Sequence, residues 1–376
     1  MQKIRCVIMR GGTSKAVVLR EEDIPSDYES RKEVLFKIFG SPDVRQIDGL
    51  GGADPLTSKC AVVGPSPTKD ADISYTFYQI GIDKPFLGEG LCGNISSTPA
   101  PFAIDEGMVK AVEPITRVRI YNTTHEKNLY AEVPVKNGKA ATEGDYKIAG
   151  VPGTGAKIML DWREIIGTMT GALLPTGNTK DKIHVEGVGD LTVSIVDSGN
   201  VAVFVNASDI GLKGTETARE VDSNNDLLNK LEAIRGTAGE MINLIKDRKK
   251  SAEENPEFPF LVFVNRAAPY TSFAGENIEA KDMDFVARMM FLQKLHKAYA
   301  ASVSLCTATA SMIPATIVND VATEGITERS LVRIGHPGGV MEVESSVQKL
   351  GNEYAVTRLA VARTARRIME GYVYIR

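Results

Sequence analysis

Short β-rich runs separated by turn residues occupy most of this chain, and this alternation restricts the folds that it can adopt. Residues 3–9 and 16–19 have strand patterns on either side of Gly11-Gly12, and Asn137-Gly138 is typical of a two-residue hairpin turn. Because no regular strand–helix–strand series recurs, the pattern indicates an α+β protein and not a doubly wound parallel sheet.

Helical spacing of apolar residues marks a few longer segments. We expect helices over residues 26–39, closed by Gly40, and over residues 222–246, with a break at Gly236. We also expect a helix over residues 282–301, where the helical pattern is strong. The chain therefore has one longer helix in each half among many strands.

A chain of 376 residues can bury a sizeable core and is most simply divided into two domains. A polar, glycine-rich stretch around residues 173–188 suits a boundary. We therefore place the domains at 1–185 and 186–376, and the last strand could return to the first domain.

Composition excludes several classes of protein. The formal net charge of −4, without a basic run, argues against a nucleic-acid partner. No window has the length and apolar character of a membrane span or of a signal peptide, so we expect no membrane partner. Four scattered cysteines are too few for a disulfide framework and fit a reducing cytoplasm. Whether the protein is a homo-oligomer stays open.

Two of the cysteines head similar hydroxyl-rich runs. Cys92 precedes Gly93, Asn94 and two serines, and Cys306 precedes Thr307 and, five positions on, Ser311. Each run resembles a loop that enters a helix, where unpaired backbone N–H groups can stabilise a thiolate or bind a carboxylate. The alternative is a buried structural thiol, and this alternative is stronger for Cys306.

Lys59 follows a second glycine-rich segment, residues 48–58, which ends in Thr57 and Ser58. A lysine partly buried at the head of a strand could transfer protons. The alternative is a solvated lysine at a strand edge. The segment lacks the Gly-Lys-Ser/Thr spacing of a phosphate-binding loop.

Two further turns contain candidate binding groups. The paired glycines Gly11 and Gly12 would let the backbone of the first hairpin approach a ligand closely, and Thr13 and Ser14 after them could donate hydroxyls to a carboxylate. The alternative is a tight hairpin with surface hydroxyls. His336, before Pro337 and two glycines, could bind a carboxylate or simply cap its own hairpin. The remaining histidines are scattered, which argues against a histidine-ligated metal.

With these motifs in view, the chain resembles the PrpF-like family, whose members share the diaminopimelate epimerase-like fold. The resemblance extends from Arg5 to nearly the last residue. It rests on the following segments: Met9–Lys15, Gly40–Lys59, Cys92–Glu106, Leu174–Asn178, Cys306–Ala308, Ile334–Gly338 and Arg363–Tyr374. Leu91 departs from the family pattern, since many relatives have asparagine before the cysteine.

The resemblance implies two pseudo-symmetric domains, each a β-sheet wrapped around a central helix, with the active site between them. It also implies a cofactor-independent and metal-independent isomerase that shifts a double bond in a small unsaturated di- or tricarboxylate. Within the family the similarity is strongest to members that convert 3-methylitaconate to dimethylmaleate. The family's catalytic lysine and cysteine correspond to Lys59 and Cys92, and its serine corresponds to Ser14.

From this we predict that Lys59 and Cys92 exchange protons with the substrate, in an order that the sequence leaves open. The groups predicted to bind substrate are Thr13, Ser14, Thr57, Ser58, Gly93 and Asn94 from the first domain and Cys306, Thr307, Ser311 and His336 from the second. The alternatives are an aconitate isomerase or 4-oxalomesaconate tautomerase, a racemase that uses both Cys92 and Cys306, and a non-catalytic protein that binds such acids.

Overall fold

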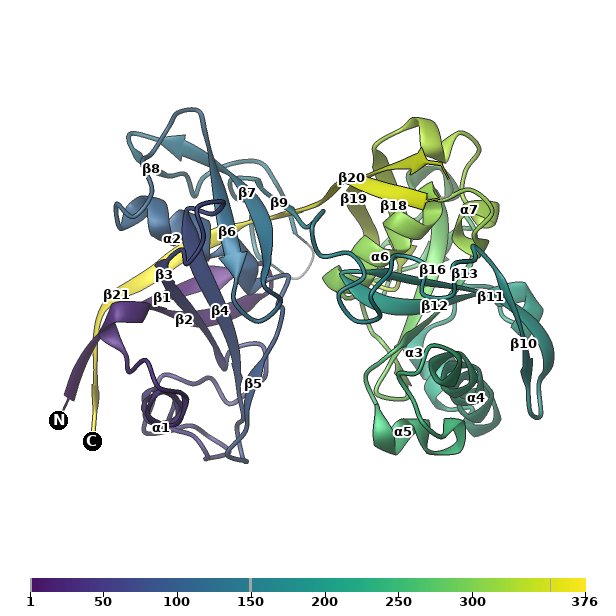
Figure 1. Cartoon of the computed structure of the whole chain (residues 1–376), viewed down its shortest axis with the longest axis horizontal. Coiled ribbons are helices and arrows are strands. Elements are labelled where there is room, and N and C mark those ends of the chain that lie inside the picture. Colours follow the sequence, from purple (N-terminus) through teal and green to yellow (C-terminus); the bar gives the residue numbers. More distant parts are fainter. Residues whose placement is uncertain (1, 149–150, 352) are drawn as a thin grey trace. The chain divides into compact units, whose positions relative to one another are not determined.

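The computed structural model describes residues 2–148, 151–351 and 353–376, which form two compact units (Figure 1). The first unit comprises Met1–Glu164 and Ala362–Arg376, and the second comprises Ile165–Val361. The chain therefore passes into its second unit earlier than the boundary expected between residues 185 and 186. Its C-terminal strand belongs to the first unit.

The first unit is built on one mixed sheet with the strand order β21–β1–β2–β3–β4–β6–β7–β9. Pairing is parallel between β2 and β3 and between β4 and β6, and antiparallel at the other steps of this order. The strands of this unit are β1 (Gln2–Gly11), β2 (Ser14–Arg20), β3 (Lys59–Pro65), β4 (Ile73–Ile80), β5 (Leu87–Glu89), β6 (Ile115–Asn122), β7 (Lys127–Lys136), β8 (Lys139–Ala140), β9 (Ile158–Asp161) and β21 (Ala365–Ile375).

The second unit repeats this arrangement. Its sheet has the order β10–β11–β12–β13–β16–β18–β19–β20, with parallel pairing between β12 and β13 and between β16 and β18. Its strands are β10 (Asp181–Val185), β11 (Gly189–Ser198), β12 (Asn200–Asn206), β13 (Phe260–Arg266), β14 (Tyr270–Thr271), β15 (Asn277–Ile278), β16 (Phe285–Phe291), β17 (Lys294–Leu295), β18 (Leu331–His336), β19 (Gly339–Leu350) and β20 (Glu353–Arg363), which ends in the first unit.

Six strands of each unit therefore correspond in order and in pairing sense: β1–β2–β3–β4–β6–β7 and β11–β12–β13–β16–β18–β19. The helices keep the same places in the chain. In each unit one helix connects the first parallel pair of strands, α1 or α4, and another precedes the last hairpin, α2 or α6. Parallel strands need such crossover connections. The expected α+β fold with two pseudo-symmetric domains is confirmed.

The helix α2 contacts β3, β6, β7 and β8, and α6 contacts β11, β12, β18 and β19, so each lies centrally against its own sheet. The α-helices are α1 (Tyr28–Phe39), α2 (Pro99–Asp105), α3 (Ala218–Asp222), α4 (Asn225–Met241), α5 (Ser251–Glu254), α6 (Ala301–Met312) and α7 (Ile317–Val321). Short 3-10 turns are η1 (Glu21–Asp23), η2 (Ile95–Ser97), η3 (Ala207–Ile210), η4 (Arg248–Lys250), η5 (Ala280–Asp282) and η6 (Ile326–Glu328).

Two predicted helices differ from the structure. Helix α4 continues through Gly236 without the expected break. The glycine serves close packing, since a Cβ at this position would lie 2.6 Å from the Arg248 carbonyl oxygen. The prediction of a helix over residues 282–301 is wrong, since this segment forms β16, β17 and the loop before α6. Six consecutive residues of β16 are buried, and a strand buried on both faces lacks the alternation that identifies strands.

Shorter features follow the sequence closely. Helix α1 ends at Gly40 in the left-handed conformation, and Asn137 and Gly138 form the turn between β7 and β8.

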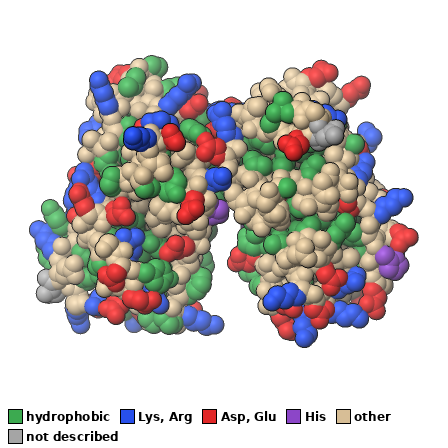
Figure 2. All heavy atoms as spheres, in the orientation of Figure 1, with side chains coloured by type: hydrophobic (Ala, Val, Ile, Leu, Met, Phe, Trp, Pro, Cys, Tyr) green, Lys and Arg blue, Asp and Glu red, His purple; other side chains and the backbone are tan. Residues whose placement is uncertain are grey.

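Acidic and basic side chains are mixed over the visible face of each unit (Figure 2). Among the described residues, no helix is both long and apolar enough to cross a membrane.

Candidate active site

Cys92 lies at the start of the helical run that leads into α2. Its carbonyl accepts hydrogen bonds from the backbone N–H and the hydroxyl of Ser96, both at 2.9 Å, and η2 and α2 continue from there. The prediction of a loop entering a helix is therefore confirmed for Cys92. The thiol is free and partly exposed. Within the described parts of the chain, the backbone N–H groups of Gly93 and Asn94 have no acceptor.

The turn after Cys92 packs against the hairpin between β1 and β2. Asn94 donates from Nδ2 to the Thr13 hydroxyl at 2.9 Å and more weakly to the Ser14 hydroxyl at 3.4 Å. A Cβ on Gly11 would lie 2.7 Å from the Asn94 carbonyl oxygen, and one on Gly12 would lie 2.2 Å from Asn94 Oδ1. The paired glycines, expected to admit a ligand, thus admit the Cys92 turn.

Lys59 begins β3 and faces the same side of the sheet as Ser14. In the parallel register Lys59 pairs with Ala16, which follows Ser14 by two residues, so these side chains share a face. Lys59 is only 8 % exposed, which excludes the solvated alternative. Its Nζ donates to Gln79 Oε1 at 2.5 Å and lies 5.2 Å from the ring centroid of Phe77. No carboxylate pairs with it among the residues described.

Thr57 and Ser58 bond within their own loop. The buried Ser58 hydroxyl donates to Gln46 Oε1 at 2.7 Å, and the same oxygen accepts the Ala53 N–H at 2.8 Å. Thr57 donates to the Asp54 carbonyl at 3.2 Å. Gln46, which the sequence analysis did not single out, therefore organises the loop that precedes Lys59.

Two buried residues near Cys92 were also not predicted from the sequence as site residues. Tyr75 lies on β4 and is fully buried. Burial raises the pKa of Tyr75, and the neighbouring Cys92 raises it further. Arg363, at the end of β20, is buried, and Cys92 is one of the two titratable groups that act on its pKa. Nothing in the local sequence distinguishes either residue from ordinary strand residues.

The Cys306 run of the second unit is not a helix entrance, contrary to the prediction. Cys306 is the sixth residue of the 12-residue helix α6; it is fully buried, and its Sγ donates to the Val196 carbonyl at 3.2 Å. Burial raises the pKa of this thiol. Thr307 and Ser311 are also fully buried and donate to the helix carbonyls of Val303 and Ala308.

Ala300 stands at the entrance of α6, the central helix of the second unit. The Cys92 carbonyl accepts the first bond of the run into α2, from the N–H four residues on, and the Ala300 carbonyl accepts the equivalent bond from Ser304 at 2.9 Å. Since α2 and α6 occupy equivalent places in the two units, the second unit has no thiol at the entrance of its central helix.

His336 caps its own hairpin. Its Nδ1 accepts the Gly338 N–H at 3.1 Å. Burial, together with the nearby Arg288 and His296, lowers the pKa of His336 to about 3. The ring is therefore neutral near pH 7 and offers no positive charge to a carboxylate. Its role in substrate binding stays a prediction.

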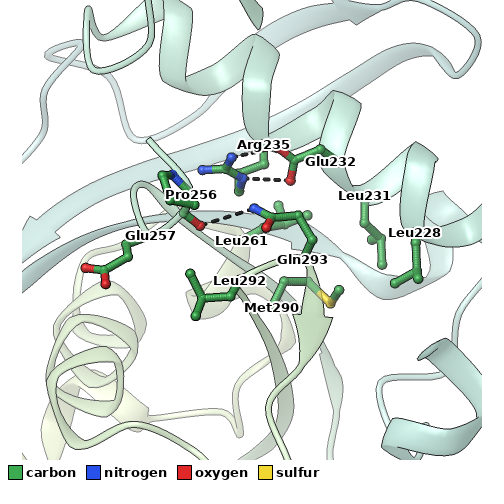
Figure 3. Close-up of a pocket in the computed structure, with 10 residues that line it drawn as sticks. All are labelled: Leu228, Leu231, Glu232, Arg235, Pro256, Glu257, Leu261, Met290, Leu292 and Gln293. Atoms are coloured by element: carbon green, nitrogen blue, oxygen red, sulfur yellow. Dashed lines mark hydrogen bonds and ion pairs between the residues drawn. The ribbon is translucent and has the colours of Figure 1, made fainter. Parts of the chain in front are cut away.

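The depression shown in Figure 3 lies in the second unit, between α4 and the β16–β17 hairpin. Arg235 pairs there with Glu232 and donates to the carbonyls of Asn255 and Phe258. Gln293 Nε2 donates to the Pro256 carbonyl at 3.2 Å. The depression contains none of the predicted site residues. Elsewhere, no cluster of three metal-ligating side chains occurs in the described ranges.

Comparisons with a family model and with curated proteins identify the same family. A family model described as PrpF protein matches residues 1–376. The 3-methylitaconate isomerase of Eubacterium barkeri is 50 % identical over 99 % of this chain and 97 % of its own. The 2-methyl-aconitate isomerase of Cupriavidus necator is 35 % identical, with the same coverage of 99 % and 97 %.

Comparison with solved structures leads to the same family and fold. A crystal structure of methylitaconate-delta-isomerase is 49 % identical, covers 100 % of this chain and 96 % of its own, and superposes with a TM-score of 0.94. A hydroxyproline epimerase from Agrobacterium vitis matches with a TM-score of 0.52 at 11 % identity, over 99 % of this chain and 92 % of its own, and so shares the fold alone.

Proposed function

Because the chain belongs to the PrpF protein family, as its motifs predicted, we propose that it is an isomerase that moves a carbon–carbon double bond by allylic proton transfer. The proposed substrate is 3-methylitaconate and the product is dimethylmaleate, following the name of the relative that is 50 % identical. The enzyme would need no added cofactor, because the reaction only relocates a proton and an electron pair.

The reaction breaks the C–H bond at the carbon that carries the methyl group, next to a carboxylate. The electron pair shifts to form the new internal double bond, and the old double bond opens toward the methylene carbon, which takes up a proton and becomes a methyl group. One group must accept the first proton and another must supply the second. The carboxylate beside the reacting carbon gains negative charge in between.

The observation on which the proposal rests is the arrangement of Lys59 and Cys92 in one unit. A buried amine without a carboxylate partner and a partly exposed thiol both belong to the region around the β1–β2 hairpin, where Asn94 joins the Cys92 turn to Thr13. The unbonded N–H groups of Gly93 and Asn94, with the hydroxyls of Thr13 and Ser14, could stabilise the developing charge.

The architecture supports an isomerase over the racemase alternative. A two-thiol mechanism needs a second reactive thiol, and the entrance of α6 in the second unit carries Ala300 and no cysteine. Cys306 is instead buried and bonded to a backbone carbonyl. Because Thr307 and Ser311 bond to their own helix, the proposal rests on the residues of the first unit.

Initial rates with a panel of acids test the proposal. Purified protein with a chelator would be mixed with 3-methylitaconate, cis- and trans-aconitate or 4-oxalomesaconate, and products followed by proton NMR. We expect the highest kcat/KM with 3-methylitaconate and no turnover by a Cys92→Ala variant. Faster turnover of an aconitate would move the assignment toward the activity named for the Cupriavidus relative. Faster turnover of 4-oxalomesaconate would instead move it toward a 4-oxalomesaconate tautomerase. Binding of these acids without any turnover would favour the accessory protein.

A further inference from the structure

Arg363 is a buried guanidinium with few partners. The residue is 7 % exposed, and its Nη1 donates to the carbonyl of the adjacent Ala362 at 2.8 Å. Its Nε has no partner, and among the residues that the structure describes no carboxylate forms an ion pair with it. Burying a positive charge without an opposite charge is costly, so such groups in folded proteins are normally paired.

The other deeply buried arginines have more hydrogen-bond and ion-pair partners. Arg235 pairs with Glu232 and donates to two carbonyls. Arg288 donates to the carbonyls of Glu216 and Ala287, and its guanidinium carbon lies 4.9 Å from the ring centroid of Tyr270. Of the three buried arginines that the structure describes, Arg363 therefore has the fewest hydrogen-bond partners.

The backbone holds Arg363 beside the proposed site. The next residue, Thr364, accepts hydrogen bonds at its carbonyl from the Gly12 N–H and from Arg10 Nη1, each at 2.9 Å. Gly12 in turn lies against Asn94 of the Cys92 turn. Burial lowers the pKa of Arg363, and the two titratable groups that act in the opposite direction are Tyr146 and Cys92.

We propose that Arg363 binds a substrate carboxylate beside Cys92, and this inference rests on the function proposed above. A guanidinium can hold a carboxylate through two parallel N–H···O bonds, which fixes the orientation of the acid as well as its position. Bound next to the carbon that loses its proton, it would also stabilise the charge that spreads into the carboxylate. The dianionic substrate would then supply the negative charge that no carboxylate of the described residues brings to Arg363.

The test uses alkylation of Cys92, since Cys6, Cys60 and Cys306 are buried. Iodoacetamide would be reacted with the wild-type protein and with Arg363→Gln, Arg363→Lys and Arg366→Gln variants, over a series of concentrations of 2,3-dimethylsuccinate. This saturated dicarboxylate resembles the substrate and cannot isomerise. Arg366 is an exposed arginine of β21 and serves as the matched control. Thermal unfolding would verify that each variant is folded.

We expect 2,3-dimethylsuccinate to protect Cys92 in the wild-type protein and in Arg366→Gln with the same constant. Arg363→Gln should need about 10- to 100-fold more acid for half-protection, the range for a lost charged hydrogen bond. Arg363→Lys, which keeps the charge without the planar fork, should fall between, and it keeps the test decisive if the glutamine variant does not fold.

Equal protection of all four proteins would overturn the assignment of Arg363 and leave the proposed function standing. Slower alkylation of Arg363→Gln without ligand, at an unchanged protection constant, would show that the guanidinium acts on the thiol and would also overturn it. If the acid does not protect even the wild-type protein, both this inference and the proposed substrate class fail.

Discussion

Asn94 Nδ2 donates a hydrogen bond to the Thr13 hydroxyl, 2.9 Å away, and this bond joins the turn after Cys92 to the hairpin between β1 and β2. The hairpin fits against the turn because Gly11 and Gly12 have no side chains. A thiol, two unbonded N–H groups and two hydroxyls are thereby gathered in one place. The proposed carboxylate site therefore depends on this contact.

Replacing Gly12 by alanine should disrupt that contact. The new Cβ would lie 2.2 Å from Asn94 Oδ1, and Gly12 has a φ of +52°, which alanine adopts at a cost of about 1 to 2 kcal/mol. We expect kcat/KM to fall by at least about 100-fold, since small misplacements of a catalytic group are costly. Steady-state kinetics and urea unfolding would measure the two effects.

Gly138→Ala is the matched control. Gly138 has a φ of +72° in the same unit, but an added Cβ would meet no atom within 4 Å. This variant should lose a similar free energy of unfolding and keep its kcat/KM. If both variants lose activity equally, backbone strain and not the Asn94 contact is responsible.

The two cysteines should respond differently to replacement by alanine. Cys92→Ala should lose at least about 1000-fold in kcat, because a proton-transfer group disappears. Cys306→Ala should keep kcat within a few-fold and lose about 1 to 2 kcal/mol of stability from the small cavity in α6. Kinetics and thermal unfolding of both variants decide this, and equal inactivation would restore the two-thiol mechanism.

Lys59→Met should separate catalysis from stability. Removing a buried ammonium group frequently costs little stability, because the cost of burying the charge disappears with it. We expect turnover to be lost while the urea midpoint changes little. A variant that keeps at least a tenth of the wild-type kcat would exclude Lys59 from proton transfer.

Glu106 should give the fold a dependence on acid pH. It pairs with Arg5, Arg20 and Arg367 and so joins the end of α2 to β1, β2 and β21. Burial alone would raise the pKa of Glu106, but the hydrogen bonds from Arg5 and Arg367 outweigh it and lower the pKa to about 2. The folded-state pKa is below the ordinary value, so the stabilisation is present above about pH 4.5 and is lost as the pH falls toward 2.

We therefore expect Glu106→Gln to lose about 2 kcal/mol at pH 7, a value reduced from the full linkage because Arg5 and Arg20 are partly solvated. The difference from the wild-type protein should narrow between pH 4.5 and 3.5 in urea unfolding. Glu143→Gln, on the surface of the same unit, is the control and should show no such difference. A gap that stays constant down to pH 3.5 would contradict the assignment.

Local chemistry made part of this structure predictable. Gly93 and Asn94 suit a turn better than a strand, so the sequence indicated the loop at Cys92, and Asn137-Gly138 indicated its hairpin. The run at Cys306 looked similar but is helical, because buried hydroxyls such as that of Thr307 bond to the carbonyl four residues back and so fit inside a helix.

Contacts between distant segments could not be predicted in this way. Arg363 reaches the β1–β2 hairpin only because β21 pairs with β1, and Tyr75 lies near Cys92 only through the packing of α2 against its sheet. Gln46 likewise acts through Ser58, on the far side of a long loop. Each of these polar residues stands in an unremarkable local sequence, and its role depends on tertiary neighbours.

Proton NMR of the wild-type protein with 3-methylitaconate in deuterium oxide tests the central claim most directly. If one of Lys59 and Cys92 removes a proton and the other returns one, the returned hydrogen comes from the solvent, and dimethylmaleate should carry deuterium in one methyl group. Unlabelled product would show that a single group carries the same proton across and would contradict the paired mechanism. Absence of any product would contradict the proposed function itself.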